Sequence, residues 1–342
     1  MSNNLERITF SSLDSLRGIA AILVAWFHYN ANWGGYLAVD FFLVLSGFVL
    51  SHSYLYSEKV DKLQFIGNRL ARLYPLHIYS LIVFTIVYMG INGSNPSYKD
   101  GTLFTLIQQF TLTNNVGLNP NGLTWNFPSW SISVEFWVNI LFVFFISKTT
   151  KNITLILISL CCLFVIYINT GHLCVHTNNY YNFINSGILR GVASFFLGVL
   201  AYRAYLYLKS YPQIDKCASM GEIISIIVIA FIVFSREGRT SSIDFLSPFV
   251  FTVVVIIFSF ERGMLSSILK KFRYLGTISY SIYLNQIAVL MTLQILLPAQ
   301  LNKIAFILSY TASLLIYSHF TYRFIEHPFR LRCRSLTSKF LS

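Results

Sequence analysis

The chain has 342 residues, of which 55% are hydrophobic and only 11% are charged. Because a soluble domain is nearer 25% charged, this composition excludes an ordinary water-soluble globular protein. Apolar runs of about 17–25 residues recur along almost the whole length, which predicts an all-α, polytopic integral membrane protein.

We predict about ten transmembrane helices in a single domain over residues 1–342, because no polar stretch is long enough for a separate soluble domain. A helix needs about 20 apolar residues to cross the hydrocarbon core. The predicted spans are 13–31, 36–56, 76–91, 130–147, 153–170, 188–208, 221–236, 245–260, 274–297 and 303–325.

The net charge of +12 would suit nucleic acid, but its distribution argues against such a partner. If the N-terminus lies inside, nearly all lysines and arginines flank the cytoplasmic ends of the spans, and the outer loops hold only Lys99, Arg236, Arg239 and Lys303. This bias follows the positive-inside rule. It predicts a multi-pass protein of the inner (plasma) membrane with both termini in the cytoplasm, and attraction to anionic membrane lipid.

The first predicted span carries Asp14, Arg17 and His28. Arg17 and His28 are eleven positions apart, so they lie about 20° from a common helix face and about 16 Å apart along the axis. An ionisable group inside a membrane is by default a candidate functional residue. The alternative is that Arg17 reaches the inner head groups while His28 ends the helix at the outer surface.

Asp40 on the second span and Glu135 on the fourth are expected at much the same outer depth as His28. The connection between the first two spans is short, so Asp40 and His28 are expected on neighbouring antiparallel helices. An Asp that accepts the imidazole N–H would fix the tautomer and support its positive charge. Ser131 precedes Glu135 by one turn on a polar stripe. Three ionisable groups meeting at one depth favour a site over structural polar contacts.

Arg69 and Arg72 lie on the cytoplasmic side of the third span and are one helical turn apart, before Pro75. Two guanidinium groups on one face suit the bidentate binding of phosphates. The alternative is ordinary anchoring by positive charge at the membrane surface. Pro75 is expected to bend or restart the chain.

Six segments in this order resemble acyltransferase family 3, the membrane O-acyltransferases of bacterial glycans. They are LDSLRGIAAILVAWFH, AVDFFLVLSGFVL, RLARLYPL, WSISVEFW, SYSIYLNQ and FIEHPF. The second, residues 38–50, is the most specific. Two departures are Gln286, where family members often have His, and FWVN after Glu135 in place of the common Glu-Gln-Phe pattern.

The resemblance implies an enzyme that takes an acyl group, most often acetyl, from cytoplasmic acyl-CoA. The acceptor would be a hydroxyl of a glycan or lipid-linked sugar. No metal is implied, and we expect no fused SGNH-type esterase domain. The implied residues fall into catalytic (His28, Asp40, Glu135), cofactor-binding (Arg17, Arg69, Arg72) and substrate-binding (Ser131, Arg190) groups. Arg190 would bind the acceptor or balance Glu135.

The rival interpretation is a proton-coupled transporter of a glycan or small molecule. Buried His, Asp, Glu and Arg also form proton relays in transporters. A transporter, however, does not need a paired-arginine site, and more often shows repeated halves with broken helices, which the sequence does not show. We therefore prefer the acyltransferase.

Overall fold

The computed structural model describes residues 9–57, 59–99, 101–119, 122–181, 183–235, 239–298 and 300–341. The α-helices are α1 Ser11–Tyr29, α2 Ala38–Leu50, α3 Lys62–Asn92, α4 Thr102–Thr111, α5 Ser129–Phe145, α6 Asn152–Thr170, α7 Ser186–Leu208, α8 Gln213–Phe234, α9 Ser247–Ser259, α10 Met264–Leu269, α11 Arg273–Thr277, α12 Ser279–Leu296, α13 Lys303–Thr321 and α14 His327–Leu341. Strands β1 Asn179–Tyr180 and β2 Ile184–Asn185 pair antiparallel. The prediction of an all-α polytopic membrane protein is confirmed.

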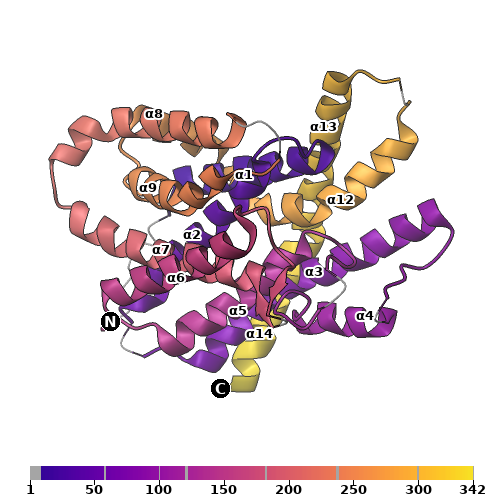
Figure 1. Cartoon of the computed structure of the whole chain (residues 1–342), viewed down its shortest axis with the longest axis horizontal. Helices are drawn as coiled ribbons and strands as arrows, with labels where there is room; N and C mark the ends of the chain where they lie inside the picture. The colour runs from indigo at the N-terminus through magenta and orange to yellow at the C-terminus, as the bar shows by residue number, and fades with distance from the viewer. Residues whose placement is uncertain are drawn as a thin grey trace.

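Nine of the predicted spans each overlap one of these helices, and the ninth in order, 274–297, covers both α11 and α12. In the described part of the chain, seven helices are long and apolar enough to cross a membrane, or eight if the bent pair formed by α10–α11 and α12 is one span. The two remaining predicted spans are α5, which is a shorter apolar helix, and α1, which has 19 residues but carries ionisable side chains. Figure 1 shows α3 with α4, and α12 with α13, as two hairpins on one side of the molecule, with α6 to α9 on the other.

Helices α2 and α7 pack closely because glycine faces glycine where they cross. A Cβ on Gly47 would collide with the carbonyl oxygen of Phe195, and a Cβ on Gly198 would collide with that of Val44. Small residues let helix backbones approach in a membrane, where close packing drives association. This contact fixes the position of Asp40 on α2 relative to Arg190 on α7.

The ninth predicted span is not one straight helix. The chain bends by 59° between the segments Met264–Thr277 and Ser279–Leu296. At the bend, a Cβ on Gly276 would collide with the carbonyl oxygen of Asp14, and a Cβ on Gly18 would collide with Leu275. The bend therefore lies directly against the first half of α1, next to Arg17.

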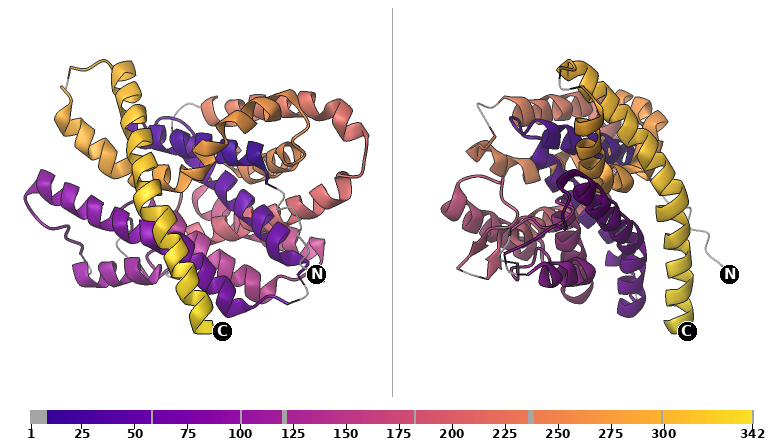
Figure 2. Two further views of the ribbon diagram at one scale, coloured as in Figure 1. Left: turned by 180° about the vertical axis from the view of Figure 1, so that it is seen from behind. Right: turned by 90° about the vertical axis from the view of Figure 1, so that its right-hand side faces the viewer.

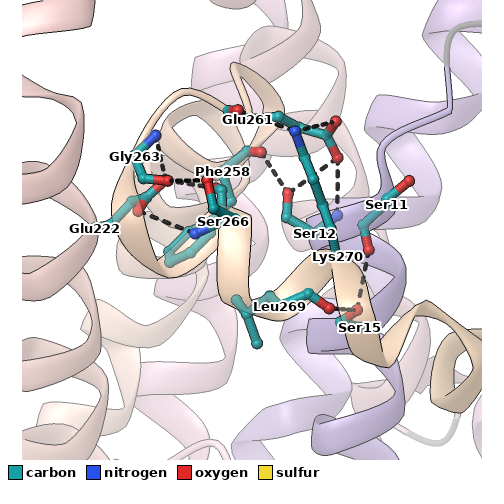
Figure 3. Close-up of polar contacts among 11 residues, drawn as sticks. Ser11, Ser12, Ser15, Glu222, Phe258, Glu261, Gly263, Ser266, Leu269 and Lys270 are labelled. Atoms are coloured by element: carbon teal, nitrogen blue, oxygen red, sulfur yellow. Dashed lines mark hydrogen bonds and ion pairs between the residues drawn. The ribbon is translucent and has the colours of Figure 1, made fainter.

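Polar contacts fix the N-terminal end of α1 to the connection between α9 and α10 (Figure 3). The backbone N–H of Ser12 donates to Glu261 at 2.8 Å, and its hydroxyl donates to the carbonyl oxygen of Phe258 at 2.7 Å. Close by, the buried carboxylate of Glu222 accepts from two backbone N–H groups at the start of α10, those of Gly263 and Ser266. These contacts at its N-terminal end thus fix how far α1 extends into the bundle.

Helix α3 continues through Pro75 and has 31 residues, so the expected restart at Pro75 does not occur. It begins where Asp61 accepts from the backbone N–H of Gln64, which is a standard helix N-cap. Its first half packs against α14, the C-terminal helix in yellow (Figure 2). Arg69 and Arg72 therefore lie on one continuous helix that extends into the bundle.

Candidate active site

The predicted site residues are divided between two neighbouring cavities. The first, which we call the arginine cavity, has a volume of about 90 Å³ and is lined by α1, α2, α3, α5 and α12. Its walls include five of the predicted residues, which are Arg17, Arg69, Arg72, Ser131 and Glu135. The structure thus brings together three arginines and one carboxylate from three helices.

Arg17 is held in place by the bend before α12. Its Nη2 donates to the carbonyl oxygen of Gly276 at 2.7 Å, its Nε donates to the hydroxyl of Ser279 at 3.0 Å, and it pairs with Asp14 at 3.1 Å. It is therefore part of the wall rather than a side chain extended toward the head groups. Its guanidinium still lines the arginine cavity and contributes positive charge to it.

Arg69 is less fully bonded. Its Nε is buried, and among the described residues it has no hydrogen-bond partner. A buried donor without a partner costs about 1–3 kcal/mol. The guanidinium also lies over the ring of Phe65 at 5.6 Å. A partly unsatisfied guanidinium beside that of Arg72 fits an anionic ligand with several acceptor oxygens, such as a phosphate.

Glu135 lies in the arginine cavity and not beside His28, which corrects the expected meeting of three ionisable groups at one depth. Its Oε1 accepts from the hydroxyl of Ser46 at 3.5 Å, and its charge offsets those of Arg17 and Arg69. The reason is its position along α5, one turn or about 6 Å beyond Ser131 and away from the histidine. A carboxylate among arginines lowers the cost of keeping several positive charges together.

The second cavity, which we call the histidine cavity, has a volume of about 490 Å³. His28 and Arg190 line it, together with Trp130 and His176, which the sequence did not indicate as site residues. Aromatic rings and a few polar groups of this kind typically form a small-molecule site. The described residues contain no group of three or more His, Cys, Asp or Glu that could hold a metal ion.

Asp40 pairs with Arg190, and this corrects the expectation that it accepts the imidazole N–H of His28. The two guanidinium contacts are 2.9 Å from Nε and 2.8 Å from Nη2, and the hydroxyls of Ser194 and Ser247 donate at 3.0 and 3.1 Å. Asp40 is fully buried and Arg190 is 1% exposed. A bidentate guanidinium satisfies a buried carboxylate better than one imidazole N–H can. Arg190 therefore does not balance Glu135.

Gln286 occupies the position beside His28. Its Nε2 donates to the carbonyl oxygen of Tyr283 at 2.8 Å, so its Oε1 faces Nδ1 of His28 at 3.1 Å. An amide oxygen can only accept, which assigns the proton to Nδ1 and leaves a lone pair on Nε2. Gln286 thus takes the orienting position that sequence analysis gave to Asp40. The only signal in the sequence was its departure from the family's His.

The two cavities adjoin each other. Val39 of α2 and Tyr283 of α12 line both of them. The hydroxyl of Ser131 donates to Oη of Tyr283 at 2.8 Å, which ties the phenol across the boundary. A group held among the arginines and a group held near His28 are therefore separated by one layer of side chains.

A family model and two curated relatives indicate an acyltransferase. A family model described as an acyltransferase domain matches residues 10–323. O-acetyltransferase OatA of Staphylococcus aureus is 25% identical over 93% of this chain and 57% of its own length. Peptidoglycan O-acetyltransferase OatA of Listeria monocytogenes is 26% identical over 93% of this chain and 55% of its own length. The chain thus spans just over half the length of these relatives. No solved structure gives a significant match.

Proposed function

This chain belongs to the acyltransferase family, and on that premise we propose that it moves an acetyl group from cytoplasmic acetyl-CoA to a hydroxyl of a glycan or lipid-linked sugar. The observation that supports this most strongly is the pair of adjoining cavities. One is cationic and suits a phosphate-bearing donor, and the other contains an oriented imidazole and aromatic walls that suit a sugar. The two relatives are O-acetyltransferases by name, which supports acetyl as the transferred group.

In this proposal Arg69 and Arg72 bind the phosphates of the donor, and Arg17 continues the cationic wall toward the thioester. The acceptor hydroxyl enters the histidine cavity, where Nε2 of His28 takes its proton. The oxygen attacks the thioester carbonyl, a C–O bond forms and the C–S bond breaks. The proton then passes from His28 to the departing sulfur, so the products are the ester and free CoA.

His28 as a transient carrier of the acyl group would use the same nitrogen. Gln286 supports either role, because it keeps the proton on Nδ1 and Nε2 unprotonated. Arg190 forms part of the acceptor wall, and Asp40 acts as a positioning residue that holds it. Glu135 and Ser131 orient groups at the edge of the arginine cavity.

In this proposal the paired arginines face the cytoplasm and His28 lies toward the outer leaflet of the plasma membrane, and the charge bias supports that orientation. Vesicles that contain the purified protein in one orientation test this arrangement, with labelled acetyl-CoA on one side and glycan acceptor on the other. We expect labelled acceptor only when acetyl-CoA is on the arginine side, without passage of intact CoA. Equal acylation from the opposite side would overturn the sidedness. Movement of unmodified acceptor without acylation would support the transporter instead.

A further inference from the structure

The boundary between the two cavities is narrow and defined. Val39 and Tyr283 line both cavities, whereas the arginines lie on one side only and His28 on the other. A group transferred from a ligand in one cavity to a ligand in the other must therefore pass these two side chains. We call Val39 and Tyr283 the partition.

Three contacts fix the position of Tyr283. Oη accepts from the hydroxyl of Ser131 at 2.8 Å, and the ring meets that of Phe42 edge to face at 5.6 Å. The backbone carbonyl accepts from Gln286, which in turn orients His28. The side chain is only 5% exposed. Rotation of the phenol would break the bond to Ser131, while the backbone bond that positions the imidazole would remain.

We propose that the partition selects the acyl group by size, so that Tyr283 and Val39 admit a two-carbon acyl group to His28 and exclude longer chains. The inference rests on the proposed function and adds a specificity determinant to it. An acyl chain on the donor either passes between Val39 and the phenol or stays in the arginine cavity, which is the smaller of the two. Each added methylene therefore needs a larger displacement of a tethered ring in a close-packed wall.

The energetic consequence can be placed on a known scale. One methylene more or less in a fitted apolar pocket changes kcat/KM by about 10–200-fold. We therefore expect the wild-type protein to prefer acetyl-CoA over propionyl-CoA by at least about tenfold, and butyryl-CoA to be used still less. Removal of a wall side chain should reduce this ratio because the longer chain then passes without displacing a ring.

The test measures acceptor-dependent release of CoA from acetyl-, propionyl- and butyryl-CoA by the full chain in detergent or vesicles. Tyr283→Ala should reduce the acetyl-to-propionyl ratio of kcat/KM about tenfold or more. Tyr283→Phe should reduce this ratio less than Tyr283→Ala, because the ring remains while its hydrogen bond to Ser131 is lost. Val39→Ala should also reduce the ratio, and Val39→Leu should increase it. The Val39 pair decides the matter if Tyr283→Ala does not fold.

Ile287→Ala is the matched control, since Ile287 lies one turn further along α12 and lines the histidine cavity only. It should leave the ratio unchanged, whatever its effect on the rate. A ratio that stays constant in Tyr283→Ala and Val39→Ala would overturn the partition, as would an equal change in Ile287→Ala. Absence of transfer from every acyl-CoA by the wild-type protein would instead overturn the proposed function.

Discussion

The buried pair of Asp40 and Arg190 gives the sharpest test of the structure. Asp40→Asn keeps the size of the side chain but removes the charge that faces the guanidinium. The carboxylate accepts four hydrogen bonds, two of them from Arg190, and hydrogen bonds to charged groups contribute about 1.5–3 kcal/mol each. Asn keeps one acceptor oxygen, so one guanidinium contact is lost and the other loses its charge. Breaking one partner of a buried ion pair typically costs about 3–5 kcal/mol, which is the destabilisation we expect.

Detergent-induced unfolding, followed by tryptophan fluorescence, measures this change in the free energy of unfolding. The double variant Asp40→Leu with Arg190→Met removes both charges, and we expect it to be more stable than Asp40→Asn because no buried charge remains unpaired. The affinity of the folded fraction for acetyl-CoA should stay at the wild-type value, because neither residue lines the arginine cavity. A loss of less than about 1 kcal/mol in Asp40→Asn would refute the reasoning. So would strict additivity in the double variant, judged against Asp40→Leu and Arg190→Met made singly.

Four further expectations concern single side chains. His28→Ala should lower the acceptor-dependent rate about 10²–10⁴-fold in a protein that still folds, and near-normal turnover would remove it from the mechanism. Gln286→Glu, which keeps an acceptor oxygen for Nδ1, should retain more activity than Gln286→Leu in the same assay. Arg69→Ala and Arg72→Ala should each weaken binding of acetyl-CoA, measured by calorimetry, with only partial rescue by Lys at position 69. Burial, and then the neighbouring arginines, lower the pKa of His176 from 6.5 to about 4. The unfolded state therefore binds the proton first, and the free energy of unfolding should fall as the pH drops below about 6.5. Thermal unfolding at pH 7 and pH 5 should show a smaller loss of stability in His176→Asn.

The sequence predicted the positions of the helices better than the contacts between their side chains. Hydrophobic runs locate the helices, and the spacing of Arg17 and His28 on one helix predicts correctly that they lie at different levels. Which residue faces His28 depends on the rotation of a neighbouring helix, and this is set by distant contacts. Asp40 is next to α1 in the sequence order, yet the glycine contacts between α2 and α7 turn it toward Arg190, 150 positions away.

The residues that sequence reasoning missed share a physical cause. Val39 and Tyr283 lie in apolar helices where aliphatic and aromatic side chains are the rule, so nothing in their type distinguishes a wall from a core. Gln286 was visible only as a departure from a family pattern. A polar residue in an apolar helix is informative because its burial costs free energy. Burial of an apolar side chain in a cavity wall carries no such cost, so the sequence does not mark it.

The separation of the two cavities has a chemical rationale under the proposed function. A thioester is stable in water for long periods but is attacked quickly by an oxygen that has an oriented base beside it. An open route between the arginines and His28 would bring water to that base whenever the donor is bound and the acceptor is absent. Under that proposal, a wall held by the bond from Ser131 would keep the base and the thioester apart until a ligand displaced the phenol. The same small layer of side chains can therefore limit both the acyl group and the loss of the donor to water, because both depend on what passes Tyr283.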